Sequence, residues 1–327
     1  METYIVGFDL GGTKMLAAVL DQNMELVASA KKKTKNIDGE DDLLDRIEEI
    51  IDEALASAEI ARGQIAGIGI AVPGVVDAAT GTVKHIPNLN LHDLDIRKGL
   101  GKRFCVPVVV ENDVNAGVYG EYRFGPASSA RHVIGLFVGT GIGGGIILDG
   151  KLYRGAGGGA GEIGHIIMQT DGPTTPVGIA GTLEGLASKT ALAKDMVMLA
   201  NAGYAPTVLQ EAGTDIARIK SSVIKKAIDN EDEAVVALVD RSIEFLGIGM
   251  ATCVQIFNPE VILLGGGVVE KLGKTYVEKA TAAMKAHCMP ALAEQVMVVE
   301  ASLGDNAVPF GAAALIKVAL QEGVSSE

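Results

Sequence analysis

The chain has 327 residues, enough for two domains that each bury a core of their own. Its formal net charge of −13 argues against nucleic acid or a membrane surface as a partner, since both need clusters of lysine and arginine. The three cysteines are far apart and form neither a zinc spacing nor a disulfide framework, which favours a reducing, cytoplasmic location.

The first segment of the chain is typical of a hairpin. An apolar strand over residues 4–8 turns at Asp9–Lys14 and resumes over residues 15–20. The only basic run, residues 31–33, is expected to be a solvated loop. The 3–4 spacing of apolar residues over 40–60 predicts an amphipathic helix, and residues 65–72 are predicted to be a buried strand stopped by Pro73-Gly74.

The middle of the chain repeats this opening. A strand over residues 106–110 is followed by Glu111-Asn112-Asp113 and a helix over 114–122. Shifting the chain by 128 positions places Gly7 on Gly135 and Gly11 on Gly139, and both stretches read strand, glycine turn, strand. The match predicts two similarly built halves, each offering a glycine turn to one central cleft.

The C-terminal part alternates long helices with short strands. A layered α/β fold is therefore predicted. We expect one domain of residues 1–120 plus 305–327, to which the final helix returns, and a second domain of residues 121–304. The predicted helices cover residues 182–202, 214–229, 231–257, 272–287 and 309–320, and the strands cover 261–264 and 296–299.

Two glycine turns are candidates for phosphate binding, because backbone N–H groups approach phosphate closely only where Cβ atoms are absent. In the first, Thr13 adds a hydroxyl donor and Asp9 could hold Mg²⁺ directly or through water. An ordinary hairpin explains that turn equally well. The second, Gly139–Gly145, contains G-x-G-x-x-G, but residues 146–150 continue as a strand and turn, not the helix that a dinucleotide fingerprint opens. Two such turns instead favour a nucleoside triphosphate held between domains.

The other candidates are polar side chains. Asp113 follows a buried strand, at the end where ligands of α/β sheets bind, and could accept a hydroxyl proton during phosphoryl transfer. Local sequence alone leans instead to a helix N-cap at Asn112-Asp113. Glu162, His165 and Glu184 suit a polyhydroxylated ligand, although a core histidine and a first-turn carboxylate explain them as well.

Five motifs follow one another along the chain: Asp9-x-Gly-Gly-Thr-Lys14, Pro73-Gly74-Val-Val-Asp77, Glu111-Asn-Asp-x-Asn115, Gly139-Thr-Gly-x-Gly-Gly-Gly145 and Gly161-Glu-x-Gly-His165. In this order they resemble the ROK family of bacterial sugar kinases and repressors. The resemblance extends through the turn at Gly265–Gly267. It implies the two-domain actin/hexokinase-type (ribonuclease-H-like) α/β fold, with ATP and Mg²⁺ in a cleft between the domains.

The resemblance also implies residue roles. Asp113 would be the general base on a sugar hydroxyl, and Asp9 would hold Mg²⁺. A homodimer or homotetramer is implied. The sugar would be held by Gly74, Asn112, Glu162, His165 and Glu184. The nucleotide would face Gly11, Gly12, Thr13, Lys14, Gly139, Thr140, Gly141, Gly265 and Gly266.

The chain departs from the family pattern in one loop. The family carries C-x-C-G-x-x-G-C-x-E after the histidine, and the three cysteines and that histidine bind structural zinc. Here Thr175, Val177 and Thr182 stand at the cysteine positions. Because these side chains cannot replace a thiolate, zinc is predicted to be absent, and the loop carrying Glu184 must be held by packing.

The leading hypothesis is therefore an ATP-dependent hexose kinase of the glucokinase kind, acting in glycolysis on C6 of glucose. Fructose, allose, mannose and N-acetylmannosamine stay open as substrates. The alternative is a non-enzymatic sugar sensor or repressor. Repressors of the family carry a helix-turn-helix domain ahead of the first glycine turn, and the strand expected from about Tyr4 leaves no room for one. A degenerate sugar-binding protein is a third possibility, disfavoured by Asp113 and the two turns.

Overall fold

The computed structural model describes residues 2–34, 37–78, 80–86, 89 and 91–323. By its internal contacts the chain divides into two compact units. The first unit comprises Met1–Ser128, Leu152–Ala160 and Leu303–Glu327, and the second comprises Ser129–Lys151 and Gly161–Ser302. The predicted domain break at residue 120 stays a prediction. The division by contacts places residues 121–128 and 152–160 in the first unit. Residues 1 and 324–327, the ends of the first predicted domain, lie outside the described residues.

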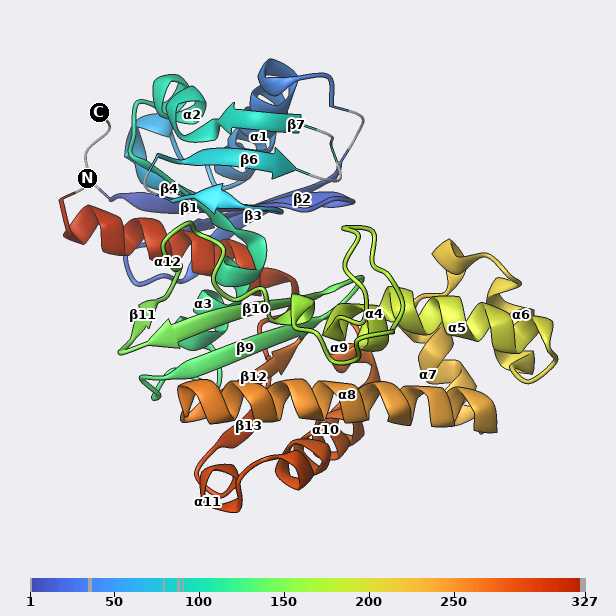
Figure 1. Ribbon diagram of the computed structural model, residues 1–327. Helices are drawn as coiled ribbons and strands as arrows, with labels where there is room; N and C mark the ends of the chain where they lie inside the picture. The colour runs from blue at the N-terminus through green and yellow to red at the C-terminus, as the bar shows by residue number, and fades with distance from the viewer. Residues whose placement is uncertain (1, 35–36, 79, 87–88, 90, 324–327) are drawn as a thin grey trace. The chain divides into compact units, whose positions relative to one another are not determined.

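A five-stranded sheet of order β3-β2-β1-β4-β8 forms the centre of the first unit (Figure 1). The predicted hairpin is confirmed, because β1 and β2 pair antiparallel on either side of the first glycine turn. Two expectations are wrong in detail: residues 31–33 lie on β3 and not in a loop, and the strand expected at 106–110 begins two residues later. The strands are β1 (Tyr4–Leu10), β2 (Lys14–Leu20), β3 (Leu26–Lys33), β4 (Ile65–Val72) and β8 (Val108–Asn112).

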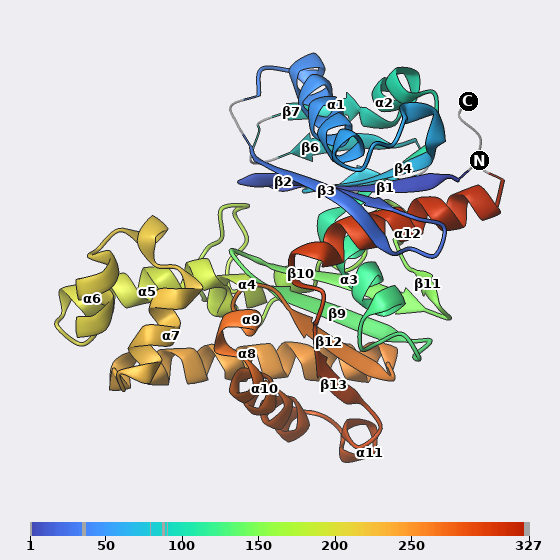
Figure 2. The ribbon, with the colours of Figure 1, turned by 180° about the vertical axis from the view of Figure 1, so that it is seen from behind.

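Helices cover both faces of this sheet. Figures 1 and 2 show α1 and α2 on one face and α12 on the other. Small residues let α12 pack closely on α3, where Gly120 and Gly311 face backbone atoms of the other helix. A three-stranded sheet, β5-β6-β7, was not predicted. The elements are α1 (Glu40–Ser57), β5 (Val76–Asp77), β6 (Thr82–Ile86), β7 (Leu91–Asp95), α2 (Ile96–Phe104), α3 (Asp113–Phe124) and α12 (Ala307–Gln321).

The sheet around which the second unit is built has the order β11-β10-β9-β12-β13. Strand β9 pairs antiparallel with β10 and parallel with β12, as β1 does with β2 and β4. The predicted internal repeat is thereby confirmed. So is the rejection of a dinucleotide fingerprint, because the second glycine turn joins two strands. The strands are β9 (Val133–Val138), β10 (Ile142–Leu148), β11 (Lys151–Leu152), β12 (Val261–Gly265) and β13 (Met297–Glu300).

The helices of the second unit differ from prediction in several places: α6 and α11 were not predicted, and Gly273 separates α9 from α10 within the helix expected over 272–287. The helix expected over 182–202 breaks at Ser188, whose extended backbone ends α4 and whose hydroxyl caps α5 by accepting from the Ala191 N–H. The helix expected over 214–229 begins only at Ser221, after a 3₁₀ turn. The helices are α4 (Leu183–Ala187), α5 (Lys189–Asn201), α6 (Pro206–Ala212), α7 (Ser221–Asp229), α8 (Glu233–Phe257), α9 (Val269–Leu272), α10 (Lys274–His287) and α11 (Pro290–Ala293).

Each unit has its own apolar core. In the first, strand residues such as Phe8 and Ile70 pack with α1 residues such as Ile47. In the second, β9 and β12 residues pack with the long helix α8 and with α10. In the described part of the chain, no helix has both the length and the apolar character needed to cross a membrane.

Candidate functional site

The carboxyl edge of the first sheet gathers most of the predicted polar residues of the first unit. Strands β1, β4 and β8 are parallel and end at the same edge. Their register places Asp9 and Glu111 on either side of Ala71, and Asn112 beside Val72. This edge is where open α/β sheets bind their ligands.

Asn112 is the N-cap of α3. Its side-chain oxygen accepts a hydrogen bond from the Asn115 N–H at 3.0 Å, and its Nδ2 donates to the Gly74 carbonyl at 3.0 Å. Asp113 is the first residue of the helix, and its Oδ1 accepts from the Val114 N–H at 2.9 Å. The cap interpretation is therefore confirmed for Asn112, while Asp113 lies at the positive end of the helix dipole, which stabilises a carboxylate.

Asp9 and Asp113 lie near enough to influence each other. Burial, and next the Asp113 charge, raise the pKa of Asp9 to about 7, while Lys14 acts in the opposite direction. Two neighbouring, half-buried carboxylates are stabilised by a divalent cation. The residues at this edge therefore fit a Mg²⁺ ion, which Asp9 would hold.

Glu111 connects the start of α3 to a distant part of the chain. This carboxylate is buried, and its Oε2 accepts from Arg154 Nε at 2.6 Å. Its Oε1 accepts from the Asn112 N–H and from Asn115 Nδ2, both at 3.0 Å. Sequence reasoning missed Arg154, which lies in the Leu152–Ala160 segment of the first unit. The pair fixes the strand-to-helix turn that carries Asp113.

The first glycine turn is held from outside the hairpin. The Thr34 hydroxyl donates to the Gly11 carbonyl at 2.6 Å, while Gly12 and Thr13 are exposed. Lys14 forms an ion pair with Asp305, which also pairs with Lys31 at 2.8 Å. Both lysines hold the pKa of Asp305 below its usual value. Asp305 gave no signal in the sequence, yet it positions Lys14.

The corresponding edge of the second sheet brings the other two glycine turns together. Strands β9 and β12 are parallel, and the Val268 N–H donates to the Val138 carbonyl at 3.1 Å. The turn Gly139–Gly141 closes on itself through a 2.8 Å bond from the Gly139 N–H to the Gly141 carbonyl. Gly266 has φ of +90°, a conformation that favours glycine. The backbone here fits a phosphate cradle.

Side chains from α4 and α5 lie on the turn at Gly139–Gly141. Glu184 Oε2 accepts from the Ile142 N–H at 2.9 Å and lies against Gly141. The Lys189 N–H donates to the Gly139 carbonyl at 3.0 Å, and Lys189 Nζ lies 3.3 Å from Thr140 Oγ1. The break at Ser188 lets the two helices place both groups here. Sequence reasoning found Glu184 but missed Lys189.

Glu162 precedes and His165 ends a 3₁₀ turn, Ile163–His165, that contacts both α4 and β10. Glu162 is exposed and its Oε2 lies 3.1 Å from His165 Nδ1. The geometry does not make a hydrogen bond, and the buried Nδ1 has no hydrogen-bond partner among the described residues. The structure thus gathers these two residues in the same unit as Glu184, and the interpretation of His165 as a satisfied core histidine is wrong for this nitrogen.

The loop without cysteines is closed by hydrogen bonds. Thr182 is buried and caps α4 by accepting from the Gly185 N–H at 3.0 Å. Thr175 Oγ1 donates to the Ile179 carbonyl at 3.0 Å, whereas Val177 is exposed. In the described part of the chain, no three His, Cys, Asp or Glu side chains are grouped to hold a metal ion. The absence of zinc stays a prediction.

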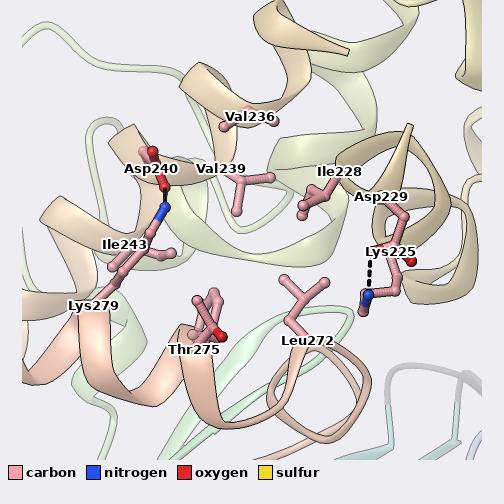
Figure 3. Close-up of a pocket in the computed structure, with 11 residues that line it drawn as sticks. Lys225, Ile228, Asp229, Val236, Val239, Asp240, Ile243, Leu272, Thr275 and Lys279 are labelled. Atoms are coloured by element: carbon pink, nitrogen blue, oxygen red, sulfur yellow. Dashed lines mark hydrogen bonds and ion pairs between the residues drawn. The ribbon is translucent and has the colours of Figure 1, made fainter. Parts of the chain in front are cut away.

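A hollow of about 210 Å³ lies apart from these residues, among α7, α8, α9 and α10. Figure 3 shows its apolar side chains, with Lys225 paired to Asp229 and Lys279 to Asp240 at the sides. None of the predicted site residues lines it.

The chain belongs to the ROK family, whose family model matches residues 5–319. It is 30% identical to the glucokinase of Halalkalibacterium halodurans, over 97% of this chain and 96% of that protein. It is also 30% identical to the xylose repressor of Caldicellulosiruptor bescii, over 95% of this chain and 77% of the repressor. The crystal structure of a ROK glucokinase from Streptomyces griseus in complex with glucose and AMPPNP matches with a TM-score of 0.82 and 31% identity, covering 95% of this chain and 98% of that one. The expected hexokinase-type α/β fold is confirmed.

Proposed function

We propose that this protein is an ATP-dependent sugar kinase that transfers the γ-phosphoryl group of ATP to a hexose hydroxyl. One observation carries the proposal: Asp113 lies at the N-terminus of α3, beside Asp9, at the carboxyl edge of parallel strands. This arrangement supports a base and a metal ligand in a chain of a family that includes glucokinases.

The residues of the first unit have different roles in the proposed reaction. Asp113 accepts the proton of the sugar hydroxyl, and Asn112, tied to the Gly74 carbonyl, orients the sugar. Glu111 and Arg154 hold the turn on which both lie. Bound Mg²⁺–ATP supplies the phosphoryl group and the cation that neutralises its charge.

The residues of the second unit contribute hydrogen bonds. Backbone N–H groups of the two glycine turns donate to phosphate oxygens. Glu184, Glu162 and His165 orient sugar hydroxyls. Val177 and the two threonines leave the adjacent loop without zinc. The enzyme would act in the cytoplasm as a homodimer or homotetramer.

Glucose is the proposed sugar, with C6 as the acceptor position. The proposal is supported by relatives named glucokinase and by the related structure that contains glucose. A non-enzymatic sugar sensor is the second candidate, favoured by xylose repressors of similar identity.

The test is ADP release from Mg²⁺–ATP across a panel of hexoses and N-acetylhexosamines. We expect turnover on one sugar. Asp113→Asn should reduce kcat by about 10²–10⁴-fold, the range of a positioned general base. Asp93→Asn is the matched control, since Asp93 is exposed on β7. Sugar binding by calorimetry without turnover on any sugar would establish the sensor instead.

A further inference from the structure

Two histidines face each other across the hairpin that β6 and β7 form in the first unit (Figure 1). The antiparallel register pairs His85 with His92, and their rings stack with centroids 4.3 Å apart and planes 8° from parallel. Side chains of such a cross-strand pair lie on one face of the sheet, with Cβ atoms about 5 Å apart. A single ion can therefore reach ring nitrogens of both histidines.

The surroundings of this pair differ from those of the chain's other three histidines. Each of those lies beside a carboxylate: His132 beside Asp149, His165 beside Glu162 and His287 beside Glu244. In the part of the chain that the structure describes, no hydrogen bond or ion pair engages a ring nitrogen of His85 or His92. Stacking fixes how these two rings lie and leaves their nitrogens available to a ligand.

The hairpin presents the two rings to solvent. His92 is exposed and His85 is half-buried, whereas the next pair on the same face, Val83 and Leu94, is buried. That apolar pair belongs to the core of the first unit and anchors the face beneath the rings. An ion therefore reaches the imidazoles without any opening of the core.

The donor atoms indicate which kind of ion fits. Imidazole nitrogen suits Zn²⁺, Ni²⁺ and Cu²⁺, whereas Mg²⁺ and Ca²⁺ prefer oxygen ligands. Asp93, the acidic residue next to His92, is paired with Lys84 at 3.7 Å. The two imidazoles are then the protein ligands, and water completes the coordination. The pair therefore favours an ion of the first group, and it shares no residue with the Mg²⁺ site assigned to Asp9.

We propose that His85 and His92 bind one divalent transition-metal ion through a ring nitrogen each, and that this ion joins β6 to β7. The site lies outside the loop for which zinc is predicted to be absent, and it does not depend on the kinase function. A sheet of three strands of two to five residues gains from such a link, because so short a ladder has few hydrogen bonds of its own.

The hairpin is also connected to the candidate site through its backbone. The Lys84 N–H, next to His85, donates to the Val75 carbonyl at 3.1 Å. Val75 follows Gly74, whose carbonyl accepts from Asn112 Nδ2. An ion that joins the two strands therefore restrains the segment that leads to Gly74.

The first experiment titrates nickel chloride into the full chain and follows binding by calorimetry. Excess Mg²⁺ is present, because it fills oxygen sites and competes poorly for imidazole. We expect one nickel ion per chain. His85→Phe and His92→Phe each keep a ring on the hairpin but remove its nitrogens. Each should weaken binding at least about tenfold, since a lost ligand costs at least as much as a lost outer-shell partner.

The matched control is His132→Ala/His287→Ala, which removes two histidines of the second unit and should bind nickel like the unaltered protein. Equal affinity in the phenylalanine variants and the unaltered protein, or no binding to the unaltered protein, overturns the site. Weaker binding in the control alone assigns the nickel to those histidines and overturns it as well. Thermal unfolding verifies that all four proteins are folded.

The second experiment measures amide hydrogen exchange of β6 and β7 with and without nickel. An ion that joins the strands should slow exchange there in the unaltered protein and have no effect in His85→Phe, because local opening of the hairpin then costs the bound ion. Binding that left the exchange of both strands unchanged would overturn the link between them.

Discussion

The hairpins β1–β2 and β9–β10 have the same strand directions and a glycine turn at the same place, but they acquire their charges differently. The first carries Asp9 and Lys14 in its own sequence. At the matching positions the second has Phe137 and Ile142. Its charged groups, Glu184 and Lys189, come instead from α4 and α5. The repeated hairpin therefore fixes where the backbone N–H groups of each glycine turn lie, while the charged side chains around the two turns differ.

The charges of the first unit also lie deeper. Glu111 is almost fully buried and Asp9 is half-buried, whereas the ion pair of Arg131 and Asp149, at the far ends of β9 and β10, is exposed on both sides. Burial removes water that would otherwise stabilise a charge, so each partner matters more. We therefore expect substitutions at ion pairs of the two units to differ in the size of their effect on stability.

The largest expected effect follows from removing Arg154. Arg154→Met leaves the buried Glu111 carboxylate without its cation and should lower the free energy of unfolding by about 3–5 kcal/mol. Arg131→Met, at the second hairpin, breaks an exposed pair and should cost less than about 1 kcal/mol. Urea unfolding of both variants measures the difference. Equal losses would show that the buried pair has no special role.

A smaller effect concerns pH. Because the pKa of Asp9 is raised from 3.8 to about 7, the folded protein holds that proton more tightly than the unfolded chain. The contribution of Asp9 to the free energy of unfolding is largest below about pH 4, decreases as the pH rises towards 7 and is constant above that pH. Between these values its slope is at most about 1.4 kcal/mol per pH unit.

Urea unfolding without Mg²⁺ at a series of pH values, in the unaltered protein and in Asp9→Asn, measures this slope. The variant should lack it. Excess Mg²⁺ should reduce it in the unaltered protein, because a bound cation favours the carboxylate. A slope that survives in Asp9→Asn would assign it to other groups.

Local sequence patterns predicted most of the strands and several of the helix boundaries. Short continuous apolar runs located β1, β2, β4 and β12, and the cap-forming Asn112 marked the start of α3. The break at Ser188 was missed because apolar spacing continues across it, although serine before Lys189-Thr190 is itself a cap signal.

The residues that support the site could not be predicted in this way. Glu111 and Arg154 are 43 positions apart, and Lys14 and Asp305 are 291 apart. No local propensity couples such pairs, because the pairing exists only once the sheet has formed. Lys189 likewise looked like an ordinary helix residue until the fold placed it on Thr140.

The smallest effects separate the two turns themselves. A Cβ on Gly11 would lie 2.5 Å from the Lys14 carbonyl oxygen, a backbone atom of the same turn, so Gly11→Ala must shift the turn and should cost about 1–3 kcal/mol. The three atoms nearest to a Cβ on Gly141 would all belong to the Glu184 carboxylate, with Oε2 at 2.2 Å, and that side chain can move away. Gly141→Ala should therefore change stability by less than about 1 kcal/mol and raise the KM for sugar, because Glu184 loses its position. Thermal unfolding and sugar saturation curves check both variants. If Gly141→Ala left the KM unchanged, the Glu184 carboxylate held on the second turn would have no part in sugar binding and would serve the fold alone.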